Sequence, residues 1–458
     1  MLSTHSPAPT AAILTLGCKV NQYESEALAE TLADAGFIIL PPHEICDLYI
    51  VNSCTVTAES DRKSRQAVRR LIKQNPKAVV IVTGCSAETD AKLMADISGV
   101  DAVVGNKEKL KAVRYALSFM ENGKPAEPVI DVPSLEDAPF EPMVITHFDR
   151  TRAYVKIQDG CESRCTYCTI PAARGRERSK PLCDVVREVA RLTHDGCREV
   201  VLTGIETGAW GKDLGKEYTL AALLRAVADI PNVGRIRLGS LDPTVITEDF
   251  ADTVAALPCV APHFHLSMQS GCSATLARMK RKYNVAQAER AMERLRTRLP
   301  SVKFTTDIIA GFPGETEEEF AETLAFARRA GFLHIHAFPY SKRVGTPAAT
   351  MKEQVPEEIK HRRVRLLNDV SRDTCQALLS REVAMGRPLT VLFETYRADT
   401  ALYHGHTPDF MEVTAPASWD VRGQEVIVVP MEIGDGVLIG RILTDPTETT
   451  KSQVKELS

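Results

Sequence analysis

Three closely spaced cysteines are the residues of this sequence best suited to chemistry. Cys161, Cys165 and Cys168 follow one another with the spacing C-x3-C-x2-C in a chain of 458 residues. A structural zinc ion takes four protein ligands, usually from two separated pairs, and no fourth cysteine or histidine lies close by in the sequence. Three thiolates on a four-iron cluster would leave one iron open to a substrate, so the spacing favours an iron-sulfur site. A zinc site whose fourth ligand lies elsewhere is the alternative.

A second set of three cysteines is separated by 36 and 31 residues. Cys18, Cys54 and Cys85 each follow the end of a predicted strand. Because the carboxyl ends of parallel strands line one edge of a sheet, we expect these three thiols to converge into a second metal site. Glycine precedes Cys18 and Cys85, which indicates close backbone approach rather than side-chain packing. The alternative is that all three are small buried residues of the core.

The elements that position these cysteines are those of an α/β protein in three parts. Residues 10–121 alternate apolar runs with helix formers, which predicts an open parallel α/β sheet, and residues 122–148, with five prolines, are interpreted as a linker. Residues 149–379 repeat strand and helix six times, which predicts a partial (β/α)6 barrel with its chemistry on the loops after the strands. Residues 380–446 predict a small antiparallel β-barrel, and residues 447–458 a polar tail.

Composition narrows the class of protein. The chain has 44% hydrophobic and 25% charged residues, which excludes a mostly disordered chain. Lysine and arginine number 56 against 60 acids, giving a net charge of −4, so any nucleic acid must be bound by local basic clusters. We find neither a membrane-spanning apolar stretch nor a secretory leader, and we expect a cytoplasmic protein. In that compartment twelve cysteines indicate metal or redox chemistry rather than disulfides.

The cysteine motifs and their surroundings resemble the radical S-adenosylmethionine (SAM) methylthiotransferase family. The resemblance runs from residue 11 to about residue 445 and rests on residues 17–25 (GCKVNQYES), 52–57 (NSCTVT), 83–85 (TGC), 156–161 (KIQDGC), 265–271 (HLSMQSG) and 306–316 (TDIIAGFPGET). It implies two 4Fe-4S clusters, one on Cys161, Cys165 and Cys168, where SAM would be cleaved to a deoxyadenosyl radical, and an auxiliary one on Cys18, Cys54 and Cys85. It also implies a low-potential electron donor, flavodoxin- or ferredoxin-like, and a C-terminal TRAM domain.

Within that family, the residues after the first cysteine indicate the substrate. Lys19, Val20, Asn21 and Gln22 resemble the branch that inserts a methylthio group at carbon 2 of N6-threonylcarbamoyladenosine, next to the anticodon of tRNA. A branch that modifies an aspartate of a ribosomal protein is one alternative, because residues 380–445 carry twice as many acids as bases. A zinc-binding protein that binds RNA without catalysis is the other.

Less specific patterns give candidates for the contacts with SAM and tRNA. For SAM we expect Tyr167 beside the cluster and four residues near later strand ends, namely Thr203, Gly204, Ser240 and Asp307. For tRNA we expect the basic run after the cysteine loop, Arg174, Arg176 and Arg178. Two histidine pairs, His263 with His265 and His334 with His336, share strand faces. We interpret them as lining the barrel or packed in it, because no third ligand is near in sequence.

Overall fold

The N-terminal unit is an open sheet in which every pair of neighbouring strands is parallel. The computed structural model describes residues 8–148 and 151–443, so the predicted tail lies outside the described residues. The sheet has the order β2-β1-β3-β4-β5-β6. Its strands are β1 (Thr10–Thr15), β2 (Ile38–Ile39), β3 (Leu48–Ser53), β4 (Val79–Gly84), β5 (Ala102–Val104) and β6 (Val129–Asp131).

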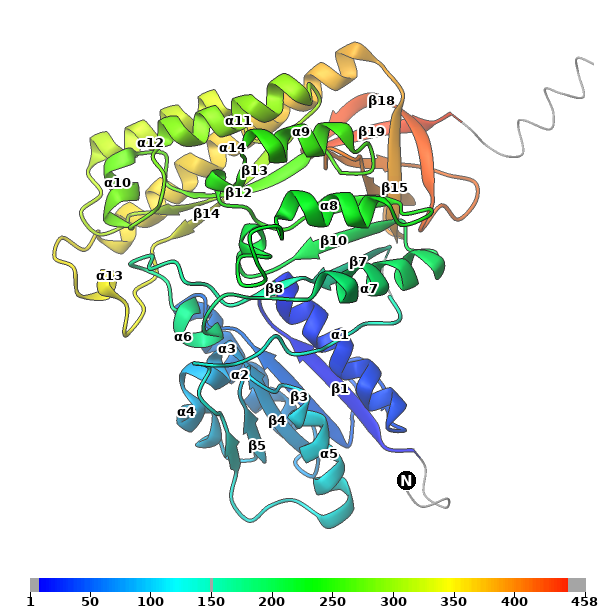
Figure 1. Ribbon diagram of the computed structural model, residues 1–458, viewed down its shortest axis with the longest axis vertical. Coiled ribbons are helices and arrows are strands. Elements are labelled where there is room, and N and C mark those ends of the chain that lie inside the picture. The colour runs from blue at the N-terminus through cyan, green and yellow to red at the C-terminus, as the bar shows by residue number, and fades with distance from the viewer. Residues whose placement is uncertain (1–7, 149–150, 444–458) are drawn as a thin grey trace, which may run out of the picture.

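Helices cover both faces of this sheet (Figure 1). Leu28 of α1 (Lys19–Asp34) and Ala116 of α5 (Lys111–Asn122) share one core with Ile50 and Ile81. The opposite face packs against α2 (Ala58–Gln74), α3 (Cys85–Thr89) and α4 (Ala91–Ala95). Strands buried on both faces account for the continuous apolar runs in the sequence. Strand β6 lies inside the segment interpreted as a linker, so part of that segment extends the sheet.

Six parallel strands form the partial barrel. They make two three-stranded sheets, β11-β10-β7 and β12-β13-β14, joined by parallel bridges from Ile236 to Val260 and from Leu241 to Leu266. The strands are β7 (Arg152–Lys156), β10 (Glu199–Thr203), β11 (Arg235–Leu238), β12 (His263–Gln269), β13 (Lys303–Ala310) and β14 (His334–Pro339). Each contains most of one predicted strand.

The barrel strands are followed by helices on the outside of the barrel (Figure 1). These are α7 (Leu182–His194), α8 (Leu220–Ala228), α9 (Glu248–Ala256), α10 (Ser273–Arg278), α11 (Val285–Arg298), α12 (Glu317–Ala330) and α14 (Glu357–Met385). The short α13 (Pro347–Thr350) lies instead beside residues 161–168, where the Ala348 N–H donates to the Thr166 carbonyl at 2.8 Å. Several of these helices begin at a residue whose side chain caps the first turn. On α11, for example, Asn284 and Gln287 form a capping box. Between β7 and α7 lie β8 (Gln158–Asp159), α6 (Ile170–Arg174) and β9 (Arg178–Ser179).

The C-terminal unit is a closed barrel of five strands in the order β15-β16-β17-β19-β18. Its strands are β15 (Leu389–Arg397), β16 (Leu402–His406), β17 (Glu412–Ala415), β18 (Glu425–Gly434) and β19 (Val437–Ile442). The prediction of a purely antiparallel arrangement is wrong, because β17 and β19 pair in parallel. The predicted boundary at residue 380 falls within α14, which continues to Met385 and packs on both β14 and β18.

The C-terminal unit lies against the amino-terminal ends of the barrel strands (Figure 1). Arg152 of β7 pairs with Glu394 at 2.6 Å, and Arg235 of β11 pairs with Glu425 at 2.5 Å. Phe410 stacks on His263, with ring centroids 4.6 Å apart. Within the described ranges, no helix combines the length and apolar character needed to cross a membrane.

Candidate functional site

The closely spaced cysteines lie on the loop between β8 and α6, and each sulfur accepts a hydrogen bond. The backbone N–H of Ser163 donates to Cys161 Sγ and that of Ile170 to Cys168 Sγ, both at 3.4 Å. The guanidinium of Arg281 donates to Cys165 Sγ, also at 3.4 Å. Donors aimed at sulfur stabilise thiolates and tune the potential of a cluster bound to them.

Burial makes two of these thiols poor thiolates unless a cation binds them. It raises the pKa of Cys168 to about 12 and also raises that of Cys161. A metal centre supplies the missing positive charge, because a coordinating thiol is deprotonated when it binds. The loop therefore fits a cluster ligand set better than a solvent-exposed redox pair.

The structure also brings Cys18, Cys54 and Cys85 to one edge of the N-terminal sheet. Cys18 directly precedes α1, Cys54 follows β3, and Cys85 is the first residue of α3. The three thiols are close enough that Cys18 and Cys85 both act on the pKa of Cys54, which burial raises to about 11. The predicted close approach at the glycines is confirmed. A Cβ on Gly17 would lie 2.9 Å from Cys54 Sγ, and one on Gly84 would lie 2.5 Å from the Ser53 nitrogen.

The spacing of the sulfurs in both sets favours a cluster over one metal ion. Three thiolates on a single zinc ion, each about 2.3 Å away, would lie about 3.8 Å apart. Within residues 8–148 and 151–443, the one group of three ligand side chains whose atoms all lie within 4.8 Å of one another is His265, Asp307 and His336. Neither cysteine set is that compact.

That compact group adds a carboxylate to the histidine pairs singled out in the sequence. His265 Nε2 lies 3.2 Å from a carboxylate oxygen of Asp307, and His336 completes the group from the neighbouring strand. No third ligand is near these histidines in the sequence, but Asp307 on β13 stands between β12 and β14 and so joins them in space. The neighbour in space is remote in sequence.

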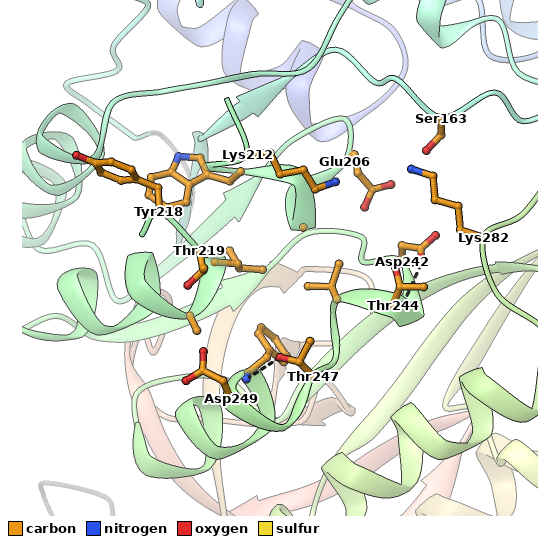
Figure 2. A pocket seen from close by; sticks show the side chains of 16 residues that line it. Ser163, Glu206, Lys212, Tyr218, Thr219, Asp242, Thr244, Thr247, Asp249 and Lys282 are labelled. Carbon is orange, nitrogen blue, oxygen red and sulfur yellow. Dashed lines mark hydrogen bonds between the residues drawn. The ribbon is translucent and has the colours of Figure 1, made fainter. Parts of the chain in front are cut away.

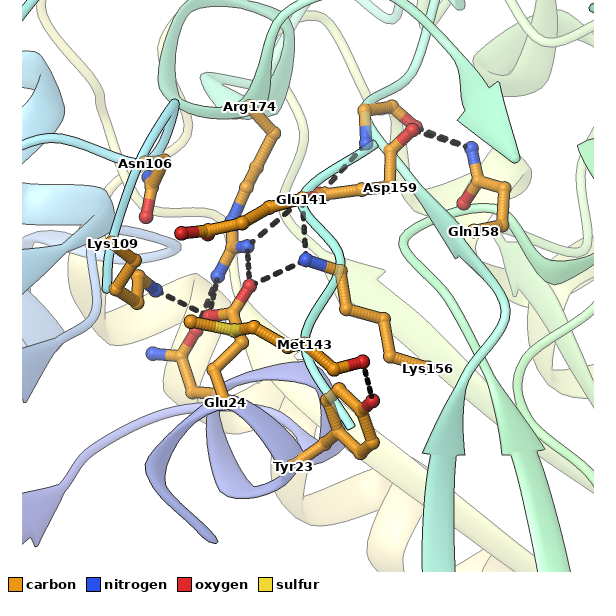
Figure 3. Close-up of polar contacts among 12 residues, drawn as sticks. Tyr23, Glu24, Asn106, Lys109, Glu141, Met143, Lys156, Gln158, Asp159 and Arg174 are labelled. Atoms are coloured by element: carbon orange, nitrogen blue, oxygen red, sulfur yellow. Dashed lines mark hydrogen bonds and ion pairs between the residues drawn. The ribbon is translucent and has the colours of Figure 1, made fainter. Parts of the chain in front are cut away.

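The two cysteine sets are joined by Arg174. Helix α6, which follows Cys168, packs against α3, which begins at Cys85. Arg174 at the end of α6 donates to Cys85 Sγ at 3.3 Å and to Asn21 Oδ1 at 2.5 Å. Its guanidinium also pairs with Glu24 of α1, as Figure 3 shows. A single side chain thus links the barrel to the second cysteine set.

Two of the three arginines proposed as tRNA contacts are buried in this ion cluster. Arg174 is 0% exposed, and Arg178 is buried and pairs with Asp159 at 3.1 Å. As tRNA contacts these two residues are wrong, because a buried guanidinium already neutralised by carboxylates cannot reach a phosphate. Arg176 is different. Its side chain is 72% exposed and pairs with Glu162, whose side chain is 50% exposed.

A cavity of ≈ 280 Å³ lies between the two units and touches the first cysteine loop. Its wall includes all three loop cysteines, and the N-terminal unit contributes Val56 and Thr57, which follow Cys54. Tyr167 and Asp307, both predicted to contact SAM, also line it. Arg343 donates to Thr55 Oγ1 at 2.6 Å and so ties the loop after β14 to the N-terminal unit at this wall.

The other three residues expected to contact SAM are placed differently. Thr203 is buried, and a Cβ on Gly204 would lie 2.8 Å from the side-chain oxygen of Gln158. Glycine at position 204 therefore allows close packing against the side chain of Gln158, not against SAM as we expected. Ser240 is exposed. Neither these two residues nor Gly204 are among the lining residues of the cavity.

Glu206 is a candidate that the sequence analysis missed. It lines both this cavity and a second one of ≈ 320 Å³, shown in Figure 2, where it lies between Lys212 and Lys282. Burial, followed by the charge of Asp242, raises the pKa of Glu206 to about 7. Its buried Oε1 has no hydrogen-bond partner in the described chain, so it is free to accept one from a ligand. Its position two residues after Gly204 is the signal that could have identified it.

Comparison with known proteins agrees with this geometry. Residues 155–327 match the radical SAM superfamily, and residues 10–105 match a family described as uncharacterized protein family UPF0004. The cobalamin- and 4Fe-4S-bound radical SAM methyltransferase TsrM from Kitasatospora setae has a similar fold, with a TM-score of 0.57 and 17% identity over 75% of this chain and 74% of that one. The fold and the cysteine loop thus define a radical SAM protein.

Relatives with curated names narrow the family. The threonylcarbamoyladenosine tRNA methylthiotransferase MtaB of Bacillus subtilis is 39% identical over 93% of this chain and 94% of its own length. MtaB of Chlamydia pneumoniae is 35% identical over 95% and 98%. A tRNA-2-methylthio-N(6)-dimethylallyladenosine synthase of Carboxydothermus hydrogenoformans is 35% identical over 78% and 81%. The chain belongs to the radical SAM tRNA methylthiotransferase family, in its MtaB-type branch. Its cofactors are SAM and two 4Fe-4S clusters.

Proposed function

We propose that this protein is a transferase that inserts a methylthio group at carbon 2 of N6-threonylcarbamoyladenosine, next to the anticodon of tRNA. The observation that carries the proposal is the placement of two three-cysteine sets around one buried contact, where α3 and α6 pack together. A reaction that needs both a radical and a sulfur donor requires two such centres near one substrate base. The relatives with this pair of domains are named for that reaction.

In this proposal Cys161, Cys165 and Cys168 hold the cluster that binds SAM, and Cys18, Cys54 and Cys85 hold the auxiliary cluster. When bound, SAM and the clusters supply one-electron radical chemistry. The protein keeps water away from it. Phe312 and Tyr340 form an apolar cluster behind Tyr167, while Ile309 and Phe338 line the cavity itself. Such walls protect a reactive species from solvent.

Polar groups of the cavity are suited to hold SAM. Asp307 and Gln269 line it from the barrel strands, and Glu206 presents its unpaired oxygen from the loop after β10. A carboxylate with a raised pKa ionises fully when an ammonium group binds beside it, because the added positive charge favours the charged form. Glu206 is therefore our candidate for the amino group of SAM.

The closed C-terminal barrel is in our proposal a TRAM domain, and a flavodoxin- or ferredoxin-like protein is the electron donor. We place tRNA at the mouth of the barrel, where exposed Arg176 lies close to the cysteine loop. Arg176 lines a surface cavity of ≈ 740 Å³ together with Cys161 and Cys165. An open recess of this size beside the cluster loop leaves room for a flipped base.

Mass spectrometry of tRNA nucleosides tests the proposal. A strain lacking the gene should lack 2-methylthio-N6-threonylcarbamoyladenosine and accumulate its unthiolated precursor, and the wild-type gene should restore the product. A gene with Cys18, Cys54 and Cys85 replaced by alanine should not restore it, although the purified variant should still cleave SAM under reducing conditions. Unchanged tRNA nucleosides together with loss of a methylthio group from a ribosomal protein would instead identify a protein substrate.

A further inference from the structure

Lys19 places an ammonium group at the junction of the N-terminal unit and the barrel. It is the first residue of α1, directly after Cys18, and α1 begins beside the barrel strands (Figure 1). The charges of Arg152, Arg237, Glu199 and Asp307, all on barrel strands, act on it. Lys19 is exposed, so its side chain faces open space beside these barrel residues rather than packed protein.

Lys19 differs from the other cations of this region in having no carboxylate. Arg152 pairs with Glu394 at 2.6 Å, and Arg237 pairs with Glu199 at 2.6 Å. Asp307, the carboxylate that could serve Lys19, is held by His265 instead. Across residues 8–148 and 151–443, no carboxylate oxygen lies within 4.0 Å of the Lys19 ammonium. A cation near two arginines that has no carboxylate of its own makes the site locally positive, so it is suited to a negatively charged ligand.

Local structure does not explain a lysine here. The amino-terminal turn of a helix favours acids, because the helix dipole is positive at that end, and a cation there is unfavourable. The first turn of α1 contains no acid, and no side chain caps its free N–H groups. A residue that opposes local preference without a structural partner is typical of a functional site.

We propose that the Lys19 ammonium binds the carboxylate of the threonyl group on the adenosine substrate, and so selects threonylcarbamoyladenosine. The inference rests on the function proposed above. The threonylcarbamoyl and dimethylallyl groups are both attached to N6 of adenosine, but only the threonylcarbamoyl group carries a carboxylate. Lys19 adjoins Cys18, the cysteine set that must face carbon 2 of the same base, so the N6 group would lie within reach of its side chain.

A backbone phosphate fits this position less well. Exposure alone would allow either ligand, because Lys19 is exposed and phosphates are bound by exposed lysines and arginines. The position of Lys19 decides between them. An ammonium beside the second cysteine set is reached by the base and its substituent. Recognition by a charged group also explains how the enzyme would distinguish threonylcarbamoyladenosine from dimethylallyladenosine, because an uncharged substituent on N6 would leave the Lys19 ammonium unpaired.

The test compares two anticodon stem-loop RNAs that differ in one group. One carries threonylcarbamoyladenosine and the other the same nucleoside with its carboxylate converted to an uncharged carboxamide. Binding and single-turnover methylthiolation are measured anaerobically with cluster-loaded wild type, Lys19→Gln, Lys19→Arg and the control Lys92→Gln, whose lysine is exposed on α4. The wild type should bind the carboxylate RNA about 10- to 100-fold more tightly than the amide RNA, the range expected for a charge-assisted hydrogen bond.

Lys19→Gln should lose that preference, Lys19→Arg should keep part of it, and Lys92→Gln should match the wild type. Iron content and SAM cleavage without RNA should be unchanged in all variants. If the wild type bound both RNAs equally well, that measurement alone would overturn the inference. So would a Lys19→Gln variant that keeps the preference, or one that loses iron, since Lys19 would then serve the cluster. If the wild type methylthiolates neither RNA, the proposed function itself fails.

Discussion

The carboxylate of Glu24 joins the N-terminal unit to the barrel, and replacing it with glutamine is a demanding test of the structure. Glu24 lies on α1 and pairs with Lys156 at 2.7 Å, with Arg174 at 2.5 Å and with Lys109 (Figure 3). All four side chains are buried. Burial acts to raise the pKa of Glu24, but the three cations hold it well below its usual value.

The charge balance gives the size of the effect. In the native cluster four cations, those of Lys109, Lys156, Arg174 and Arg178, meet the carboxylates of Glu24 and Asp159. Glu24→Gln leaves one carboxylate, and Lys109 then has none among the described residues. Removing one partner of a buried ion pair costs about 3–5 kcal/mol, because the other charge stays buried and uncompensated. We expect the free energy of unfolding to fall by that amount.

Equilibrium urea unfolding followed by tryptophan fluorescence measures this loss, since Trp210 is buried in the barrel unit. The matched control is Glu59→Gln on α2, whose partner Arg62 is exposed, and which should cost far less than Glu24→Gln because solvent screens the pair. The double variant Glu24→Gln, Lys109→Met should recover part of the loss because the orphaned cation is gone. A Glu24→Gln variant as stable as Glu59→Gln would refute the reasoning.

Three further outcomes are expected. Iron should fall from about eight to about four atoms per chain when Cys161, Cys165 and Cys168 become alanine, and unchanged iron or bound zinc would exclude the two-cluster arrangement. Arg176→Ala should flatten the slope of log tRNA affinity against log salt by roughly 0.7–0.9 in binding titrations, and an unaltered slope would remove Arg176 from the RNA contacts. Burial alone would raise the pKa of Glu199, but the charges of Arg237, Arg152 and Arg235 outweigh it. The pKa therefore falls to about 2, against an ordinary value of 4.5. This pair of values contributes about 3 kcal/mol of stability above pH 4.5 that disappears as the pH falls towards 2. Glu199→Gln should therefore reduce the acid dependence of unfolding, and a variant with the wild-type dependence would contradict this assignment.

The cysteine sets could be predicted because their signal is local. The C-x3-C-x2-C spacing lies within one loop, and Cys18, Cys54 and Cys85 each follow a strand whose apolar run is visible in the sequence. Convergence then follows from parallel pairing alone. Among the barrel strands, β10 contains such an apolar run, whereas β11, β12 and β14 alternate polar with apolar residues, which is also a strand pattern.

The residues that sequence reasoning misplaced depend on partners far along the chain. Arg174 belongs to a basic run that suggests RNA, yet its partner Glu24 lies 150 positions earlier. Asp307 joins two histidines only after three strands pair side by side. Strand β6 has three residues among prolines, too few for a hydrophobic pattern to identify. The end of α14 could have been predicted from the sequence, because Gly386 ends the helix in the left-handed conformation that favours glycine.

The contact between the C-terminal unit and the barrel limits what a truncated chain can reveal. Ending the protein after α14 would remove Glu394 and Glu425, the partners of Arg152 and Arg235, and would admit water to the amino-terminal end of the barrel. Phe410, which covers His263 and Arg237, would be lost as well. If such a fragment were inactive, the cause could be damage to the amino-terminal end of the barrel rather than the loss of an RNA contact. Single substitutions on the outer surface of the C-terminal unit leave that end of the barrel intact, and so they separate the two causes.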